Sequence, residues 1–205
     1  MGLKIINAST KLLVSTSDLR DHVRGSTADN ALITAYGRAA QQYAEGYTRR
    51  SIYLQKYRLT LSEFPESGTI ELPRSPGSTS SLASTSGPVT ISYLQDGGST
   101  WTEWSSTAGG WRLDVDQEPP RVELRYGEAW PTATRETGGS VRVDFHAGYA
   151  STASTWVSEP PKGIDQAIRL IVGHWYENRE DVVIGTMTAR VPRAADALLW
   201  MERVE

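Results

Sequence analysis

Residues 141–178, VRVDFHAGYASTASTWVSEPPKGIDQAIRLIVGHWYEN, contain the change of pattern that decides the fold. At its start, Val141, Val143 and Phe145 alternate with polar residues, which is typical of a half-buried strand. After the double proline the apolar residues recur at spacings of three and four, as in an amphipathic helix. These residues are Ile164, Ala167, Ile168, Ile171, Val172 and Trp175. A β segment therefore ends here and a helical segment begins.

The alternating pattern extends back to about residue 51. Between its runs, the glycines of Asp96-Gly97-Gly98 and Gly109-Gly110 supply the positive φ angles that hairpins need. Residues 75–88, SPGSTSSLASTSGP, are too small and polar to pack, which predicts a mobile loop. We therefore expect an antiparallel β-sandwich or small barrel. The other residues predicted to face its core are Tyr57, Leu59, Leu61, Val89, Ile91, Tyr93, Val122, Leu124 and Tyr126.

Two helices are predicted before the β segment. Thr16 or Ser17 can cap a short helix over about 18–24, which Gly25 ends. A longer helix is predicted over about 28–47, where Gly37 costs about 1 kcal/mol relative to alanine and so indicates close packing. The residues predicted to form its buried face are Leu32, Tyr36, Ala39, Ala40, Tyr43 and Tyr47.

The order of these segments predicts an α+β protein with a discontinuous helical domain. Its two parts are residues 1–50 and 158–205, and the β domain, residues 51–157, is inserted between them. Neither helical part can hold a core alone, so we expect them to pack together. Residues 180–191 have no clear period and are expected to be flexible, and a last short helix should follow Pro192.

Composition excludes several classes of protein. The 205 residues are 39% hydrophobic and include seven tryptophans, so the chain can build a substantial core. The formal net charge of −3 gives no basic field for general nucleic-acid binding. The absence of cysteine excludes disulfides, thiolate metal sites and thiol nucleophiles. No stretch has the apolar length of a secretory signal or a membrane span, so we expect synthesis in the cytoplasm and no membrane partner.

No arrangement of residues indicates catalysis, a metal or a cofactor. His22, His146 and His174 lie in three different elements and are expected to be ordinary surface or packing residues. His146 falls on the polar face of its strand. Glu123 and Asp144 could form a glycosidase pair, but only in a cleft that the sequence does not indicate. The chain is therefore not expected to be an enzyme.

Two local clusters of residues could bind a ligand, although each also has a purely structural explanation. Asp114, Asp116 and Glu118 could attract a hard cation, but they lack the glycine and distal glutamate of a calcium loop, which favours a solvated strand end. Trp101 and Trp104 could stack on sugars. Because they are three residues apart, a regular strand puts them on opposite faces, and one should be in the core. Trp111 lies near these two tryptophans in the sequence. The alternative function is thus a carbohydrate-binding β module of a phage tail or secreted enzyme.

Four stretches in order resemble the tailed-phage head–tail connector family, also called adaptor or head-completion proteins. They cover most of the chain, although residues 75–121 match only in general character. The stretches are SDLRDHVR followed by AAQQYAEGYTRRS (17–24 and 39–51), YRLTLSEFPESGTIELPRSP (57–76), VRVDFHAGYA (141–150) and IDQAIRLIVGHWYENRED (164–181).

The resemblance implies a structural virion protein at the head–tail junction. Members of the family form rings, usually of about twelve copies, beneath the portal protein. The ring extends the channel, through which double-stranded DNA passes without specific binding, and offers a platform to the stopper or tail-completion protein.

The family also implies that the C-terminal segment docks onto the portal. An apolar cluster beside basic residues near a chain end suits that role, and the alternative is that it folds back onto its own core. The docking candidates are Arg190, Arg193, Leu198, Leu199 and Trp200. Glu177, Arg179 and Glu180 could form ion pairs between subunits, although a solvated helix end explains them equally well.

Overall fold

The computed structural model describes residues 2–77, 88–95, 100–104, 110–133, 139–149, 159–178 and 192–204. These residues form two compact units. A helical unit contains the described residues from 10 to 52 and from 159 to 204, and a β unit contains residues 2–9 and the described residues between 53 and 149. The predicted α+β class with an inserted β domain is confirmed, and the sheets are not closed into a barrel.

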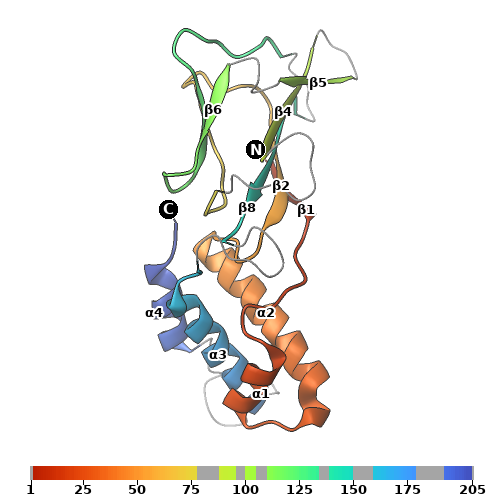
Figure 1. Ribbon diagram of the computed structural model, residues 1–205, viewed down its shortest axis with the longest axis vertical. Coiled ribbons are helices and arrows are strands. Elements are labelled where there is room, and N and C mark those ends of the chain that lie inside the picture. The colour runs from red at the N-terminus through yellow and green to blue at the C-terminus, as the bar shows by residue number, and fades with distance from the viewer. Residues whose placement is uncertain are drawn as a thin grey trace, which may run out of the picture. The chain divides into compact units, whose positions relative to one another are not determined.

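The helical unit has two helices from each part of the chain. Its elements are α1 (Thr16–Val23), a turn of 3-10 helix η1 (Thr27–Asp29), α2 (Asn30–Thr48), α3 (Lys162–Glu177) and α4 (Arg193–Met201). Helix α3 packs against α1, α2 and α4, so it holds the unit together (Figure 1). The two distant parts of the sequence therefore share one core.

The ends of α1 follow from local hydrogen bonds. The cap is Ser15, one residue before the predicted candidates, and its side chain accepts a bond from the backbone N–H of Asp18 at 3.1 Å. Arg24 ends the helix in the left-handed region with a φ of 53°. The N–H of Gly25 then donates to the carbonyl of Arg20 at 3.0 Å, which closes the helix end where the sequence predicted it.

The buried face of α2 is rotated by one residue from the prediction. Tyr36 and Tyr43 lie at its flanks instead of its centre. Gln41 is buried because its side chain accepts from the N–H of Leu13 at 2.8 Å and donates to the carbonyl of Lys11 at 3.0 Å. The pattern of apolar residues does not predict that a polar amide side chain is buried when its hydrogen bonds are made inside the protein. The buried residues are Ile33, Gly37, Ala40, Gln41, Ala44 and Thr48.

Close packing at Gly37 is confirmed. A Cβ atom there would lie 2.7 Å from Cδ1 of Leu19, so only glycine lets α1 approach α2 this closely. Helix α3 buries five of the six residues predicted for its core face, Ile164, Ala167, Ile168, Ile171 and Val172. The sixth, Trp175, is half-buried and contacts the ring of Tyr36 edge-on, with 6.1 Å between centroids.

The β unit consists of two antiparallel sheets. The five-stranded sheet has the order β1-β2-β8-β4-β5 and the three-stranded sheet the order β3-β7-β6. The strands are β1 (Gly2–Asn7), β2 (Gln55–Leu61), β3 (Thr69–Glu71), β4 (Val89–Leu94), β5 (Trp101–Trp104), β6 (Trp111–Asp114), β7 (Arg121–Leu124) and β8 (Val141–Ala147). Strand β1 was not predicted. The sequence placed residues 1–50 in the helical domain, whereas residues 2–9 belong to the β unit.

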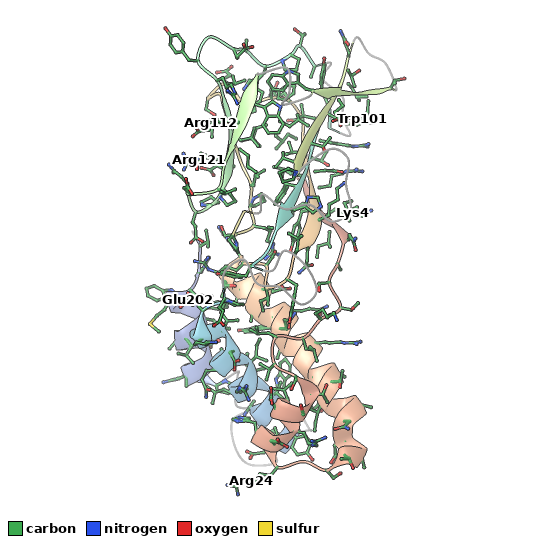
Figure 2. All side chains as sticks on the ribbon, viewed as in Figure 1. Lys4, Arg24, Trp101, Arg112, Arg121 and Glu202 are labelled. Atoms are coloured by element: carbon green, nitrogen blue, oxygen red, sulfur yellow. The ribbon has the colours of Figure 1, made fainter. Side chains whose placement is uncertain are left out.

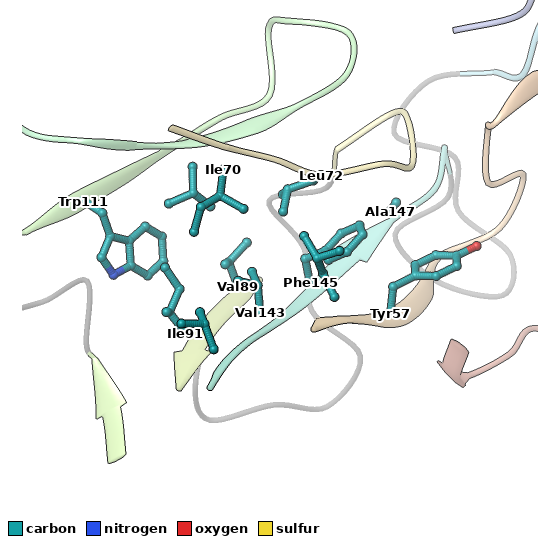
Figure 3. Close-up of a cluster of buried hydrophobic side chains, with 12 residues drawn as sticks. Tyr57, Ile70, Leu72, Val89, Ile91, Trp111, Val143, Phe145 and Ala147 are labelled. Atoms are coloured by element: carbon teal, nitrogen blue, oxygen red, sulfur yellow. The ribbon is translucent and has the colours of Figure 1, made fainter. Parts of the chain in front are cut away.

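The two sheets pack their inner faces on one hydrophobic core (Figure 3). Its members come from β2, β3, β4, β6, β7 and β8, and the rings of Tyr57 and Phe145 stack with 5.5 Å between centroids. The predicted alternation is therefore correct for these strands, with one exception. Tyr126 was expected on the apolar face of its strand, but β7 ends at Leu124 and Tyr126 is fully exposed in a turn.

The ends of the predicted 75–88 loop are packed. Ser75 is fully buried, Gly77 bridges to Ala147, and the carbonyl of Pro88 accepts a bond from the N–H of His146 at 3.1 Å. The composition of the segment does not predict these backbone contacts. Residues 78–87 lie outside the described residues, as do the turn residues 96–99 and 105–109. The flexible connection predicted over 180–191 lies outside them as well.

Candidate functional site

The two carboxylates weighed as a glycosidase pair lie in different sheets, and each is paired with an arginine. Glu123 in β7 accepts from Arg112 at 2.6 Å. Asp144 in β8 accepts from Nε and Nη2 of Arg58 at 2.7 and 2.9 Å, and Lys56 lies 3.2 Å away. These contacts account for both carboxylates as cross-strand ion pairs.

The charges around Asp144 also decide its protonation. Burial alone would raise the pKa of Asp144, but the hydrogen bonds and charges of Arg58 and Lys56 outweigh burial and hold the pKa below its ordinary value. A general acid needs a raised pKa instead. Asp144 therefore stabilises the sheet as a permanent anion.

The three histidines do not come together. His22 lies against Gly173 of α3, and His174 lies near the end of the same helix, within 3.3 Å of the side chain of Asn178. His146 occupies the predicted polar face of β8 but is buried, with Nδ1 donating to the carbonyl of Pro88 at 3.0 Å. Burial lowers the pKa of His146, so this ring is neutral.

The acidic run forms the turn between β6 and β7. The N–H of Asp116 donates to the Asp114 side chain at 3.0 Å, while Asp116 and Glu118 are exposed. Residues Arg112 to Gln117 line a hollow of about 640 Å³. Among the described residues, no group of acidic or histidine side chains has the arrangement of a metal site.

The three tryptophans considered for sugar binding, Trp101, Trp104 and Trp111, do not make an exposed platform. Trp104 packs against the core with Phe64 and Trp130, and Trp111 is buried with its indole N–H donating to the carbonyl of Trp104 at 3.2 Å. Trp101 faces the other way, and the guanidinium of Arg142 lies 3.6 Å from the centre of its ring. The prediction that the two residues of β5 lie on opposite faces, with one in the core, is confirmed.

The predicted portal-docking residues divide into a buried and an exposed set. Leu199 is fully buried in the helical unit, so it is part of the core and unavailable to a partner. Arg193 and Trp200 are exposed, Leu198 is half-buried, and Arg190 lies outside the described residues. Met201, which was not among the predicted docking residues, is 68% exposed, and its neighbour Trp200 is 67% exposed.

The end of the chain is anchored. The N–H of Val204 donates to the carbonyl of Thr48 at 3.0 Å, and Nε of Arg50 donates to the carbonyl of Glu202 at 2.7 Å. Val204 is buried. These contacts hold α4 on the helical unit and turn the exposed Trp200 and Met201 away from its core.

Of the predicted subunit-interface residues, Glu177 is exposed at the last residue of α3. A negative charge at a helix C-terminus is unfavourable for the helix dipole, so Glu177 does not stabilise its own helix. Arg179 and Glu180 lie outside the described residues.

Sequence reasoning missed the surface that β1 forms. Leu3, Ile5 and Ile6 are 39%, 47% and 41% exposed, and Lys4 is exposed between them (Figure 2). The alternation of Leu3 and Ile5 with Lys4 is the signal that could have revealed a strand. An irregularity in the β1–β2 register between Ile5 and Asn7 breaks the period of this run.

None of the helices in the described part of the chain has the length and apolar character of a membrane span. No protein-family model matches the chain, and no curated protein matches its sequence.

Solved structures match along the whole chain. A chain in the neck of an empty gene transfer agent particle, computed with C6 symmetry, is 29% identical with a TM-score of 0.74. A chain of the native gene transfer agent virion is 29% identical with a TM-score of 0.73, and one in the native neck, computed with C12 symmetry, is 28% identical with a TM-score of 0.71. Each match covers 100% of this chain and 96% of the other. The resemblance to a head–tail connector-type protein is confirmed.

Proposed function

We propose that this protein is a head–tail adaptor that forms a ring beneath the portal, extends the DNA channel and offers a docking platform to the stopper or tail. The observation that carries the proposal is the likeness, over the whole chain, to components of a particle neck. That likeness supports a structural virion protein located at the head–tail junction.

A ring of about twelve copies is the form that the proposal favours. The neck of the native particle was computed with C12 symmetry, which makes this copy number the natural expectation for the present chain. A closed ring with cyclic symmetry uses two different surfaces on every subunit. The formal net charge of −3 suits a channel in which DNA slides, because neutralisation of phosphates would instead retain the DNA.

Portal docking is assigned to the exposed face of α4. Trp200 and Met201 supply apolar anchors, and Arg193 supplies a charge about two turns earlier on the helix. Aromatic, methionine and arginine side chains are the types enriched at the centres of protein interfaces. Because Leu199 and Val204 hold the helix from behind, the exposed face is already ordered, which lowers the entropic cost of binding.

Point variants test this assignment better than a truncation. Removal of residues 192–205 would also remove the buried Ala195, Leu199 and Val204 and damage the core of the helical unit. We expect Trp200→Ala to weaken retention of the full chain on immobilised portal rings by at least about tenfold, the effect typical of an interface anchor. Tyr126→Ala, which removes an exposed aromatic side chain from the β unit, serves as the matched control. Unchanged retention of Trp200→Ala would show that α4 does not dock on the portal.

A further inference from the structure

The exposed face of α4 is basic as well as apolar. Arg193 and Arg203 lie seven residues before and three residues after Trp200, so the helical repeat places all three on nearly the same side. The N–H of Arg203 donates to the carbonyl of Trp200 at 3.3 Å, which continues the turn past the end of α4. Both arginines are exposed, and neither forms an ion pair with another described residue.

A third arginine emerges at the neighbouring end of α2. The N–H of Val204 donates to the carbonyl of Thr48 at 3.0 Å, so the backbone next to Arg203 runs beside the backbone next to Arg49. Arg49 is exposed and has no ion pair within the described part of the chain. It ends α2 in the left-handed region with a φ of 57°, where glycine or asparagine is favoured. The fold itself therefore does not require an arginine at this position.

The carboxylates near these arginines bind inside the helical unit. Asp196 accepts a hydrogen bond from the hydroxyl of Tyr43 at 3.2 Å, and Glu45 accepts one from a backbone N–H at 2.8 Å. A Cβ atom at Gly163 would lie 3.7 Å from Oε1 of Glu202. The carboxylate of Glu202 is thus at the first turn of α3, where the helix dipole favours an anion. The acidic groups stabilise the unit, and the positive charge stays outside.

The docking surface, meaning Arg49, Arg193, Trp200, Met201 and Arg203, therefore combines two apolar side chains with three cations and no carboxylate. Glu205, the next residue, lies outside the described residues. We propose that this surface binds a pocket of the portal that has apolar walls and a rim of carboxylates. The inference rests on the proposed function and adds the chemistry of the partner, because arginine pairs with carboxylates through two parallel hydrogen bonds.

Double-stranded DNA is the other polyanion that an adaptor would meet. Phosphates would neutralise the arginines but would gain nothing from the apolar side chains of Trp200 and Met201, since the bases of a duplex are stacked inside. An apolar pocket with carboxylates satisfies both parts of the surface. Apolar anchors at the centre and charges at the rim are also the usual arrangement of a protein interface.

Zero-length crosslinking tests for the carboxylates directly. Arg49→Lys and Arg203→Lys keep the positive charge and supply an amine, which a carbodiimide joins to a carboxylate in contact with it. The full-length variants are bound to the purified portal and treated with the carbodiimide, and the joined peptides are identified by mass spectrometry. We expect amide bonds from residues 49 and 203 to aspartate or glutamate residues of the portal. Variants that stay bound but crosslink at neither position overturn the inference.

The chain offers a closely matched control in Arg24. This arginine is also exposed, and it ends α1 in the left-handed region with a φ of 53°. It lies before the start of α2, whereas Arg49 lies after its end, and Figure 2 shows Arg24 and Glu202 at opposite ends of the helical unit. Arg24→Lys should therefore give no crosslink to the portal. A crosslink as strong as that of Arg203→Lys would mean that the reaction does not report the proposed contact.

Salt dependence tests the electrostatics. Arg49→Glu and Arg203→Glu should each weaken retention on immobilised portal rings by about three- to fivefold at about 0.05 M salt, and by less than about 1.5-fold at about 0.5 M. Arg24→Glu, with the same charge change at a helix end, should stay within about 1.5-fold of the wild type throughout. The loss from Trp200→Ala should persist at both concentrations, because apolar burial is not screened. Arginine variants that bind like the wild type at low salt contradict the acidic rim.

The remaining outcomes separate this inference from the proposed function. If the wild-type chain does not bind the portal, the adaptor function fails and the inference fails with it. If Trp200→Ala loses retention while the arginine variants do not, docking through α4 stands and the acidic partner is wrong. If Arg203→Glu instead loses retention of a double-stranded DNA fragment, the surface binds phosphate. Crosslinks to carboxylates of a second copy would likewise overturn the inference and place the surface between subunits.

Discussion

The helical unit and the β unit each have their own hydrophobic core, but they differ in the residues that they expose to solvent. In the helical unit, polar side chains bind their own chain, as Gln41 does with residues 11 and 13 and Arg50 with Glu202. Among its described residues, the exposed large apolar side chains are those of Trp200 and Met201, both at the end of α4. In the β unit, exposed apolar residues concentrate on β1 beside a basic sheet face.

The difference teaches which residues serve folding and which are available for assembly. Residues such as Phe145 and Ile168 are buried in the cores and stabilise each unit by itself. The exposed apolar residues at the end of α4 contribute little to the core, and we propose that they contact another molecule. Substitutions can separate these two roles.

Core substitutions should have the largest effect and should remain local. Phe145→Ala in the β unit and Ile168→Ala in the helical unit should each lower the free energy of unfolding by about 3–4 kcal/mol, the cost of a large cavity. Hydrogen exchange resolved by peptide is the measurement, with faster exchange expected in the mutated unit. Equal acceleration in both units from either variant would contradict the division of the chain into two units.

Two glycines of α2 should respond in opposite ways to the same change. Gly37→Ala places a Cβ 2.7 Å from Leu19 Cδ1 and should destabilise the helical unit by about 1–3 kcal/mol. At Gly46 a Cβ meets nothing within 4 Å, so Gly46→Ala should stabilise the helix by up to about 1 kcal/mol. Chemical denaturation measures both. A stabilising Gly37→Ala would show that α1 does not pack closely there.

His146 should make the stability of the β unit depend on pH. In the folded state, burial lowers the pKa of this histidine below its ordinary value of 6.5. As the pH falls, the unfolded chain therefore takes up a proton before the folded chain does. Stability should therefore be full above about pH 6.5 and should decrease below it. Denaturation midpoints measured between about pH 7.5 and 5.5 test this, and His146→Gln should flatten that part of the profile. An equally steep profile in the variant assigns the loss to other groups.

Surface substitution on α4 should have the smallest effect on stability. Trp200→Ala removes a side chain that is 67% exposed, so the free energy of unfolding should change by no more than about 0.5 kcal/mol. The denaturation midpoint measures this change. This is the same variant that should lose portal retention. A loss of several kcal/mol would mean that Trp200 belongs to the core and that weakened docking follows from unfolding.

The fold could be predicted where one face of an element is apolar and the other polar. The stripe of α3 and the alternation of β8 follow directly from their sequences. The face of α2 was misplaced because the buried Gln41 gains its stability from hydrogen bonds to residues 11 and 13, which lie far away in sequence. Strand β1 is irregular and exposed on both faces, so it lacks the contrast between a buried and an exposed face that periodicity detects.

The candidate assembly surfaces were only partly predictable. The cluster around Trp200 is visible in the sequence, but the sequence does not reveal that Leu199 faces inward while Met201 faces outward. That division depends on how α4 is anchored by the bonds of Glu202 and Val204.

The central claim, a ring-forming adaptor, is tested most directly by native mass spectrometry of the wild-type chain mixed with the purified portal protein. The account predicts a discrete complex with one fixed number of copies, twelve if the symmetry of the native neck applies. A chain that stays unbound, or that binds in a continuous ladder of copy numbers without a closed species, would contradict it.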